Sequence, residues 1–576
     1  MKIKDRYIVV FFLLVMFVLA TTSMAQKSLT VDETTHLSSG YSYWKLFDYS
    51  LNKEHPPLMK LLAAAPLLII QPDLSVDSET IEEASQWDVG KEMLFWDDDN
   101  DGDWILFWGR IPMVLVALLL GFFVWKWAYE LYGRWAAFFA LFLYILSPTI
   151  LAHSRLVHTD LGITAFYFIT TYFFWKLCKN EDKNKTRKYM WLTGLFFGLA
   201  LAAKFSGIYL LGVFGLLFVV EIIYKILIKE FKKEVKLIDI FKKKETQEYL
   251  KKFLIVIILI VLIGCGVLVL SYGVKEFPNY IEGFKSVVKH SQVGHPAFLF
   301  GEHYNIGKWH YFPIAFLLKT PIPTLIFLGF GLYLFARKKW KNNYNELFLI
   351  LPALLYFGLF LPNKINIGVR HVMPILPFVF VFVSSIINLE IKKKIWRNIC
   401  IAIFAILCLW YLLSSLFIYP HYLAYFNEFA GGPDNGHNYL LDSNIDWGQD
   451  LKGLDKWLDE NNIDDKITLG YFGHEDSNWR IGEFDRFKCA ATPGIVAISA
   501  NLLHDFQNIN QGCTDWLNEY EPITKIGYSI FVYDINDEDI IIKELECKEV
   551  CKQSCSEQGK EYYDSGWSDK CLCNCA

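Results

Sequence analysis

Long apolar blocks separated by short charged stretches fill the chain as far as about residue 418. A first apolar run covers 7–20, and each later block is long enough to cross a hydrocarbon core of about 30 Å at about 1.5 Å of rise per residue. The later blocks lie at 104–126, 135–152, 159–178, 189–204, 207–228, 252–272, 311–336, 344–361, 371–389 and 397–418. The pattern predicts an all-α polytopic membrane protein with about eleven transmembrane helices.

Basic residues between the blocks predict the orientation, because loops rich in Lys and Arg stay in the cytoplasm. With the N-terminus inside, the cytoplasmic loops are 127–134, 179–188, 229–251, 337–343 and 390–396, and the last four contain basic clusters. The C-terminus is then outside, and the extracytoplasmic pieces are 26–103, 273–310 and 420–576. A signal peptide cleaved after Ser23-Met24-Ala25 is the alternative for the first segment, and it leaves the next segment outside as well.

The extracytoplasmic pieces contain shorter elements. Pro57–Leu68 is apolar but too short to span, and we interpret it as a helix near the membrane interface. Lys466–Phe472, Gly494–Ser499 and Ile526–Val532 have the composition of strands, and Gln449–Asn461 predicts an amphipathic helix. We therefore predict a transmembrane module at 1–419 with its first outer loop at 26–103, a small α/β domain at 420–545 and a cysteine-rich tail at 546–576.

The composition is that of an integral membrane protein, and it says little about which function the protein has. The hydrophobic fraction is 53%, aromatic residues make up 17%, and the mean hydropathy of +0.26 is too high for a soluble chain of 576 residues. The formal net charge of -5 is spread unevenly, and no basic domain points to nucleic acid. We expect a multi-pass plasma membrane protein surrounded by lipid, with its site and C-terminal domain outside the cytoplasm.

Eight of the 12 cysteines fall in the outer C-terminal region. An even number of cysteines in an oxidising compartment predicts disulfides, which would stabilise a tail too small for a core of its own. A zinc site in the tail is the alternative. The eight are Cys489, Cys513, Cys547, Cys551, Cys555, Cys571, Cys573 and Cys575.

An acidic pair, Asp32-Glu33, directly follows the first apolar segment. One interpretation is a solvated and inert interfacial pair. The other is a general base, because adjacent carboxylates in a partly dehydrated cleft raise each other's pKa values until one accepts a proton near neutral pH.

Cations gather at the face opposite the cytoplasm, against the usual charge bias. Taken singly, each could reach toward lipid headgroups or support the structure. Together they favour an anionic partner such as a lipid-linked phosphate. The residues are His55, Lys60, Arg110, His153, Arg155, His158, Lys204, Arg370 and His371.

The run at 97–103 reads DDDNDGD and is a weak candidate metal site. Asp97, Asp99, Asp101 and Gly102 match the start of a calcium loop, but Trp108 stands where that loop needs Glu. A solvated acidic surface is the alternative, so a divalent cation stays open as a cofactor. Asp442, Asn444 and Asp446 form a still weaker match.

Several of these motifs together resemble a known class of enzymes. Asp32-Glu33 after the first span, followed by His55-Pro-Pro-Leu58 and Lys60, resembles the polyprenyl-phosphate-sugar-dependent glycosyltransferases of the GT-C class. The protein O-mannosyltransferases (glycosyltransferase family 39) and their prokaryotic branch are most similar, and the lipid A aminoarabinose transferases are more distant. Further matching pieces are Arg110-Ile-Pro, Ser154-Arg155 with Asp160, Lys204-Phe-Ser-Gly207, Gly368-Val-Arg370-His371, and 425–432 through 442–449.

The resemblance implies transfer of a sugar, most simply a mannose-like hexose, from a polyprenyl phosphate to an acceptor hydroxyl on the outer face, with inversion. It implies that Asp32 is the general base beside Glu33. His55 and Lys60 would lie near donor and acceptor, and Arg110 would help to hold the lipid phosphate. We also expect Arg155, Lys204, Arg370 and His371 to bind substrate. The partners would be the lipid-linked donor and an acceptor protein or glycolipid.

The chain departs from the eukaryotic family members in one respect. The loop at 273–310 is too short for their additional β-trefoil module, so the α/β domain is the alternative place for the acceptor. His295, His303, Trp309 and His310 in that loop are expected to pack rather than line the site. A lipid-sugar transporter and a non-catalytic scaffold remain alternatives, although transporters tend to have inverted repeats and this chain has none that we recognise.

Overall fold

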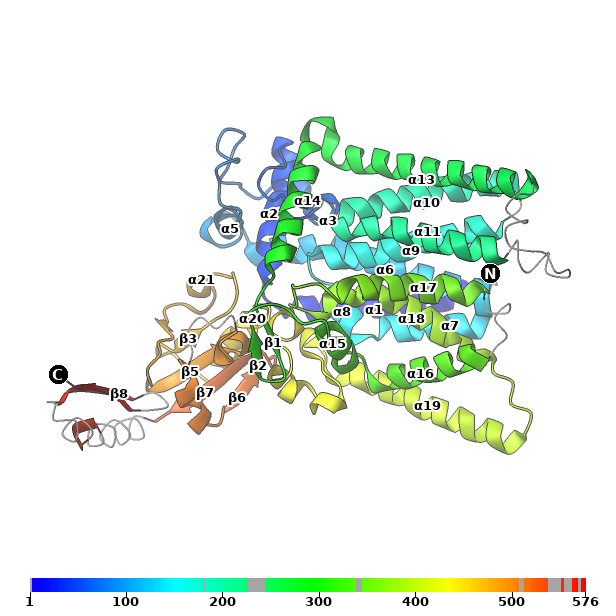
Figure 1. Ribbon diagram of the computed structural model, residues 1–576. Coiled ribbons are helices and arrows are strands. Elements are labelled where there is room, and N and C mark those ends of the chain that lie inside the picture. The colour runs from blue at the N-terminus through cyan, green and yellow to red at the C-terminus, as the bar shows by residue number, and fades with distance from the viewer. Residues whose placement is uncertain are drawn as a thin grey trace.

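The computed structural model describes residues 3–180, 182–224, 244–337, 344–506, 512–536, 551–553, 562–567 and 571–575. Most of these residues form a bundle of long helices, and a small sheet lies at one end of it, opposite the N-terminus (Figure 1). The bundle helices are α1 (Ile3–Met24), α6 (Gly102–Tyr132), α7 (Arg134–Ile145), α9 (Thr159–Lys179), α10 (Lys183–Ala203), α11 (Tyr209–Ile222), α13 (Lys244–Glu276), α15 (Tyr311–Lys319), α16 (Ile322–Arg337), α17 (Tyr344–Phe360), α18 (Leu376–Ser384) and α19 (Lys394–Phe417).

Every apolar block of the sequence contains helix in the described part of the chain, which confirms the polytopic all-α prediction. Seven described helices are long and apolar enough to cross a membrane, and the bent pair α15–α16 would be an eighth. Helices α7 and α17 are apolar but shorter, with 12 and 17 residues. The protein is therefore an integral multi-pass membrane protein. The predicted loops 229–251 and 337–343 lie largely outside the described residues.

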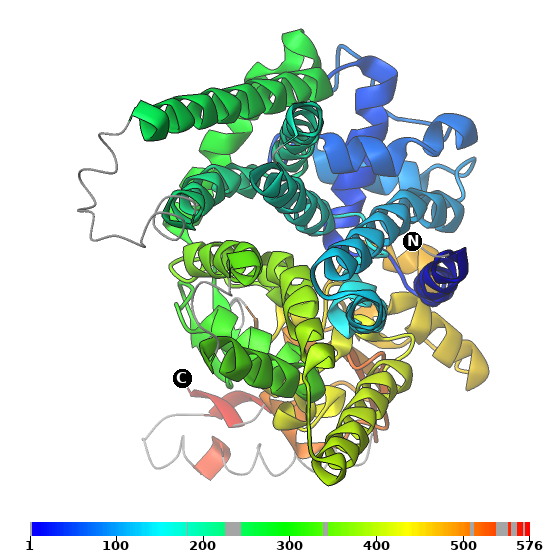
Figure 2. The ribbon, with the colours of Figure 1, turned by 90° about the vertical axis from the view of Figure 1, so that its right-hand side faces the viewer.

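The helices pack around α6 and α9, whose side chains are mostly buried. Figure 2 shows the bundle from the N-terminal end, so that many of its helices are seen nearly along their axes. Helix α10 packs against α9 and α13, and α6 packs against α1, α7 and α9. This arrangement leaves α13 and α19 at the periphery, where most of their apolar side chains face the surroundings rather than other helices.

The bend between α15 and α16 measures 113°, and it breaks the helical hydrogen-bond ladder. Such a break leaves carbonyl groups that need new donors in an apolar environment. Asn427, from the segment after α19, supplies them: its Nδ2 donates to the carbonyls of Leu317 at 2.6 Å and Thr320 at 2.7 Å. Its backbone N–H donates to Leu318 at 2.9 Å. The segment after α19 thus completes a bend in the membrane module.

Short helices cover the end of the bundle opposite the N-terminus, which we call the outer end after the predicted orientation (Figure 1). The apolar segment expected at the interface forms α3 and α4, separated by Pro66. Helix α2 packs against both of them, and α2 and α14 are the longer helices at this end (Figure 1). The outer helices are α2 (Val31–Leu46), α3 (Leu58–Ala64), α4 (Leu67–Ile70), α5 (Gln86–Lys91), α8 (Pro148–His153) and α14 (Pro278–Val293), and a hairpin of β1 (Ala297–Leu299) and β2 (Glu302–Tyr304) follows α14.

The α/β region contains a five-stranded sheet in the order β4-β3-β5-β7-β6. Strand β3 is parallel to β4 and β5, whereas β7 is antiparallel to β5 and β6. The predicted helix is present as α20, and Leu451, Leu454 and Leu458 bury its apolar face against the sheet. The elements are β3 (Thr468–Gly470), β4 (Asp485–Arg486), β5 (Gly494–Ser499), β6 (Thr524–Ile526), β7 (Ile530–Ile535), α20 (Leu451–Glu460), α21 (Ser477–Ile481) and α22 (Ala500–Leu503).

The predicted single strand Ile526–Val532 was wrong. A tight turn divides it, and the two halves belong to the hairpin β6–β7. Gly527 and Tyr528 both have positive φ, 59° and 67°, which reverses the chain direction. The apolar pattern continues through the turn, so periodicity alone did not reveal it.

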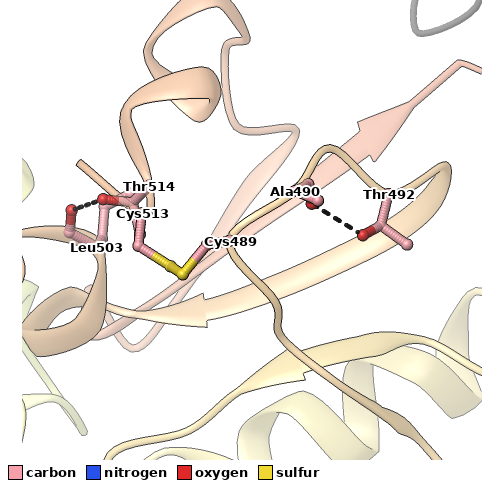
Figure 3. The surroundings of a disulfide bond; sticks show 6 residues. All are labelled: Cys489, Ala490, Thr492, Leu503, Cys513 and Thr514. Atoms are coloured by element: carbon pink, nitrogen blue, oxygen red, sulfur yellow. Dashed lines mark hydrogen bonds between the residues drawn. A yellow bond between two sulfur atoms is a disulfide. The ribbon is translucent and has the colours of Figure 1, made fainter. Parts of the chain in front are cut away.

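One disulfide joins Cys489 and Cys513 in this region (Figure 3). It links the segment after β4 to the segment after α22. Cys551 is also disulfide-bonded. Cys547 and Cys555 lie outside the described residues, and of Cys571, Cys573 and Cys575 only the backbone is described, in the hairpin of β8 (Tyr562–Trp567) and β9 (Cys571–Cys575).

Candidate active site

Asp32 lies in the first turn of α2, and local sequence explains why the helix begins there. Thr30 is the N-cap in an extended conformation. Glu33 accepts hydrogen bonds from the Thr30 backbone N–H at 2.9 Å and from the Thr30 hydroxyl at 3.0 Å. This is the reciprocal capping box expected from Thr-x-x-Glu. Neighbouring residues on a helix point about 100° apart. Asp32 and Glu33 therefore face different surroundings.

Glu33 points into the protein, where Arg110 of α6 holds it. The Arg110 guanidinium donates to both Glu33 oxygens, at 2.8 and 2.6 Å, and the Val157 N–H donates at 2.9 Å. The remaining Arg110 N–H groups donate to the carbonyls of Met24, Lys27 and Ser28. All five donors of Arg110 are thus used within the protein. The pair fixes the segment that connects α1 to Asp32.

Asp32 instead borders a cavity of about 540 Å³ at the outer end of the bundle. Its side chain is 26% exposed. Four other residues expected at the site line the same cavity: His55, Lys204, Arg370 and His371. Helix α14 and the turn Phe205–Ile208 supply much of the remaining wall. Segments far apart in the sequence therefore bring Asp32 and several basic side chains to a single cavity, which Glu54 also lines.

Arg370 is the centre of this arrangement. Its Nη1 lies 2.9 Å from Asp32 Oδ2 and 3.7 Å from Asp160 Oδ2, and its Nε donates to Ser443 Oγ at 3.0 Å. The guanidinium also lies over the ring of Trp447, 4.0 Å from the centroid. Ser443 and Trp447 both come from the outer segment after α19, so this segment orients the arginine toward Asp32.

Lys204 is held in the same way by a buried carboxylate. Its Nζ lies 2.6 Å from Asp160 Oδ1, at the end of α10. Asp160 is in the first turn of α9, where the helix dipole favours a negative charge. Since Asp160 contacts both Lys204 and Arg370, it sets the spacing between the two cations.

Electrostatics correct the expected behaviour of the acidic pair. Burial raises the pKa of Asp32, but its surroundings, foremost the positive charge of Arg370 beside it, more than offset burial and lower the pKa to about 2. The pKa of Glu33 is lowered as well, because Arg110 outweighs the effect of burial. The hypothesis that the two carboxylates raise each other's pKa values was wrong, because each has a cationic partner of its own.

Two cavity histidines have ring nitrogens available for a substrate. The Nδ1 atoms of His55 and His371 are buried and have no hydrogen-bond partner among the described residues. Burial lowers the pKa of His55 well below its usual value, and Lys204 adds to this shift. A neutral His55 can donate or accept a hydrogen bond in the cavity without adding charge.

Lys60 does not line the cavity, although it follows His55 closely in the sequence. Its ammonium group donates to the backbone and side-chain oxygens of Asn52, both at 2.7 Å. It also donates to the His55 carbonyl at 2.9 Å and to Tyr43 Oη at 3.2 Å. Burial lowers its pKa to about 7. Lys60 therefore shapes the turn that presents His55.

Arg155 lies in a separate polar cluster. Its Nη2 donates to the Pro420 carbonyl at 2.9 Å, and its guanidinium lies 5.5 Å from the Tyr422 ring centroid. Nearby, Lys27 forms a buried ion pair with Asp450. This cluster joins α8, the end of α1 and the outer segment, and Arg155 is not part of the cavity wall.

The acidic run and the short loop occupy surface positions. Carboxylate oxygens of Asp97 and Asp99 lie within 4.8 Å of one another and of Asp73, whereas Asp101 instead caps α6 by accepting the Trp104 N–H. In the loop after α14, His303 packs at 5.2 Å from Phe298, and Trp309 is 67% exposed. His295 and His310 do not line the cavity either.

The structure places further residues at the site that the sequence motifs did not single out. His36 is one helical turn after Asp32, and its ring centroid lies 5.8 Å from that of His55. The i, i+4 spacing of Asp32 and His36 was the available signal. Asp442, beside Arg370, has its pKa raised to about 6 by burial. The sequence pieces that resemble the GT-C enzymes also contain Asp160, Ser443 and Trp447, but they did not predict that these residues lie at the site.

Comparison with known proteins agrees with the motifs. Residues 9–272, less than half of the chain, match the family model described as dolichyl-phosphate-mannose-protein mannosyltransferase. Similar solved structures include ArnT from Cupriavidus metallidurans bound to undecaprenyl phosphate, at 12% identity and a TM-score of 0.49, covering 91% of this chain and 97% of that chain. The Archaeoglobus fulgidus oligosaccharyltransferase has 13% identity and a TM-score of 0.45, with 84% and 64% covered.

The S. cerevisiae protein O-mannosyltransferase Pmt1-Pmt2 complex bound to the sugar donor is also similar, at 16% identity and a TM-score of 0.33, with 50% of this chain and 34% of that chain covered. No curated protein sequence matches the chain. The family model confirms the resemblance seen in the motifs: the protein is a membrane glycosyltransferase of the GT-C class that uses a lipid-linked donor. Within this class, residues 9–272 carry the pattern of the protein mannosyltransferases, glycosyltransferase family 39.

Proposed function

We propose that the enzyme transfers a mannose-like hexose from a polyprenyl phosphate to an acceptor hydroxyl on the extracytoplasmic face, with inversion and with Asp32 as general base. The observation that carries this proposal is the cavity that Asp32, Lys204 and Arg370 line together, in which Arg370 lies 2.9 Å from Asp32. A carboxylate opposite paired cations suits a reaction in which a hydroxyl attacks and a phosphate leaves.

The proposed reaction is a single displacement. The acceptor oxygen forms a bond to the anomeric carbon, the bond from that carbon to the phosphate oxygen breaks, and the phosphate keeps the electron pair. The acceptor proton moves to Asp32. Lys204 and Arg370 neutralise the charge that develops on the leaving phosphate, and His55 and His371 are placed to hydrogen-bond the sugar or the phosphate.

The contact between Arg370 and Asp32 also suggests how the base is activated. Without donor, Arg370 helps to keep the pKa of Asp32 at about 2. A donor phosphate competes for the same guanidinium, which weakens its hold on Asp32. Burial then makes Asp32 a stronger base at the moment when the donor is in place. Binding of the donor and activation of the base would thus be coupled.

We assign supporting positions to the other expected residues. Glu33 and Arg110 hold the segment before Asp32, Lys60 shapes the turn before α3, and Arg155 joins the outer segment to α8. We also propose residues 1–419 as the catalytic module, 420–545 as the α/β domain and 546–576 as the disulfide tail. The α/β region contributes Ser443 and Trp447 to the site.

The test is release of polyprenyl phosphate by the purified protein in detergent, with a panel of polyprenyl-phosphate sugars and with water as the attacking hydroxyl in place of the acceptor. We expect release from one donor, and its loss in Asp32→Asn, which keeps the shape of the side chain but removes its negative charge. Asp98→Asn is the matched control, since Asp98 is an exposed aspartate of the same outer loop. Full turnover by Asp32→Asn would refute the assignment of the base, and no binding of any donor would refute the lipid-phosphate site.

A further inference from the structure

A second cavity, of about 390 Å³, lies in the α/β region. The residues that line it come later in the sequence than those that line the cavity beside Asp32. It is formed by the segments that follow β3, β4 and β5, where these strands end. The three strands are parallel, so their carboxyl ends meet at one edge of the sheet. That edge is where open α/β sheets bind ligands. The volume is within the range of small-molecule sites.

The wall of this cavity combines aromatic rings with a few polar groups. Phe484 and Phe487 contribute partly buried rings, and Phe487 is stacked on buried Trp516, with centroids 6.2 Å apart. Ser477, Arg486 and Glu475 contribute a hydroxyl, a guanidinium and a carboxylate. A sugar ring has an apolar C–H face and a rim of hydroxyls, and it needs this combination of a flat apolar surface and hydrogen-bonding groups.

The cavity is held open by covalent and close backbone contacts. The disulfide Cys489–Cys513 joins the segment after β4 to the segment after α22, and both cysteines line the cavity (Figure 3). Gly470 packs so closely that an added Cβ would lie 3.1 Å from Ile498 and 3.2 Å from Phe487. A preformed wall lowers the entropy lost when a ligand binds.

The segment Tyr471–Glu475 connects this cavity to the donor site. Glu475 lines the cavity and accepts the Leu29 N–H at 2.9 Å, three residues before Asp32. Tyr471 also lines it and donates its hydroxyl proton to the Gly448 carbonyl at 2.6 Å, next to the Trp447 ring that covers Arg370. The backbone that leads to Asp32 and the segment that carries Trp447 over Arg370 are therefore each joined to the cavity wall by a hydrogen bond.

We propose that this cavity is the binding site for a neutral saccharide, and that the saccharide is part of the acceptor. The second half of the proposal rests on the proposed function. The ligand class is a hexose or N-acetylhexosamine unit of a glycan or glycolipid, recognised by ring stacking on Phe487 and by hydrogen bonds to Arg486 and Ser477. A glycan bound there places the acceptor on the side of the membrane that holds Asp32.

The first experiment measures binding without catalysis. Full-length protein in lipid nanodiscs is applied to an array of immobilised glycans that end in neutral hexoses or N-acetylhexosamines, with a peptide array beside it. We expect glycan binding by the native protein. Ser477→Trp fills the cavity and should abolish it, and Arg486→Ala should weaken it about tenfold through loss of a charged hydrogen-bond donor. Lys488→Ala is the control, because Lys488 is an exposed cation two residues from Arg486 and does not line the cavity.

The outcomes separate this inference from the proposed function. A bound glycan that is lost in Ser477→Trp, with the melting temperature and donor binding unchanged, supports the saccharide site. Absence of glycan binding, glycan binding that survives Ser477→Trp, or binding of peptides alone overturns it, even when Asp32-dependent donor turnover is present. When the bound glycan is offered as acceptor, Arg486→Ala should raise its KM and leave the KM of the donor unchanged. An unchanged KM for that glycan overturns the acceptor assignment.

Discussion

Replacement of Arg110 by methionine tests whether this residue supports Asp32 or binds the donor. Arg110 and Glu33 are 1% and 0% exposed. In Arg110→Met, the Glu33 carboxylate loses two charged hydrogen bonds but stays buried, and three backbone carbonyls lose their donor. Removal of one partner from a buried ion pair costs about 3–5 kcal/mol. We expect a loss of this size in the free energy of unfolding.

The assay is unfolding by SDS in mixed micelles, followed by tryptophan fluorescence, together with donor binding by the folded fraction. Glu33→Gln and the double variant complete a mutant cycle, in which the double variant should be less destabilised than the sum of the single variants because no buried charge is left without a partner. Lys126→Met is the control, as it removes a partly exposed cation from the same helix. Native stability of Arg110→Met combined with loss of donor binding would refute this reasoning and place Arg110 at the phosphate.

Two further predictions concern pH and the disulfide. Because the pKa of Asp32 is lowered to about 2, Asp32 stays ionised until the pH falls far below neutrality, and kcat/KM for the donor should have no acid limb between about pH 5 and 8; a limb near pH 6 would instead indicate Asp442, whose pKa burial raises to about 6. Replacing Cys489 and Cys513 by serine opens a loop with a sequence separation of 24, which should destabilise the α/β region by about 3–4 kcal/mol. Faster proteolysis or amide exchange confined to that region would confirm this, and unchanged protection would contradict it.

The sequence predicted the membrane module well because a helix must be predominantly apolar where it crosses the hydrocarbon core. It was less reliable where the chain turns within an apolar pattern: Ile526–Val532 reads as one strand, yet positive φ values at Gly527 and Tyr528 divide it. The bend at α15–α16 was missed for a similar reason, since the block 311–336 is apolar throughout and the bend depends on Asn427, far along the chain.

For the site, the motifs brought the right segments to attention but could not assign geometry. Asp32, Lys204 and Arg370 do meet at one cavity. Glu33 is an anion like Asp32, and Arg110 is a cation like Arg370, yet Glu33 and Arg110 pair with each other inside the protein. Which carboxylate meets which cation depends on the direction of α2 relative to α6 and on backbone carbonyls that no motif encodes. The remaining information in the sequence was local: the spacing of Asp32 and His36 places both side chains on the same face of a helix.

The dependence of the α15–α16 bend on Asn427 has a consequence for biosynthesis. Thr320 and Asn427 are 107 residues apart. At synthesis rates of about 5–20 residues per second, Asn427 is made about 5–20 s after the bend that it completes. During this interval the carbonyls of Leu317 and Thr320 lack their final donor. The nascent chain must therefore pass through a stage in which this span is already inserted but not yet folded, and substitutions at Asn427 should act at that stage, during insertion, before the finished enzyme exists.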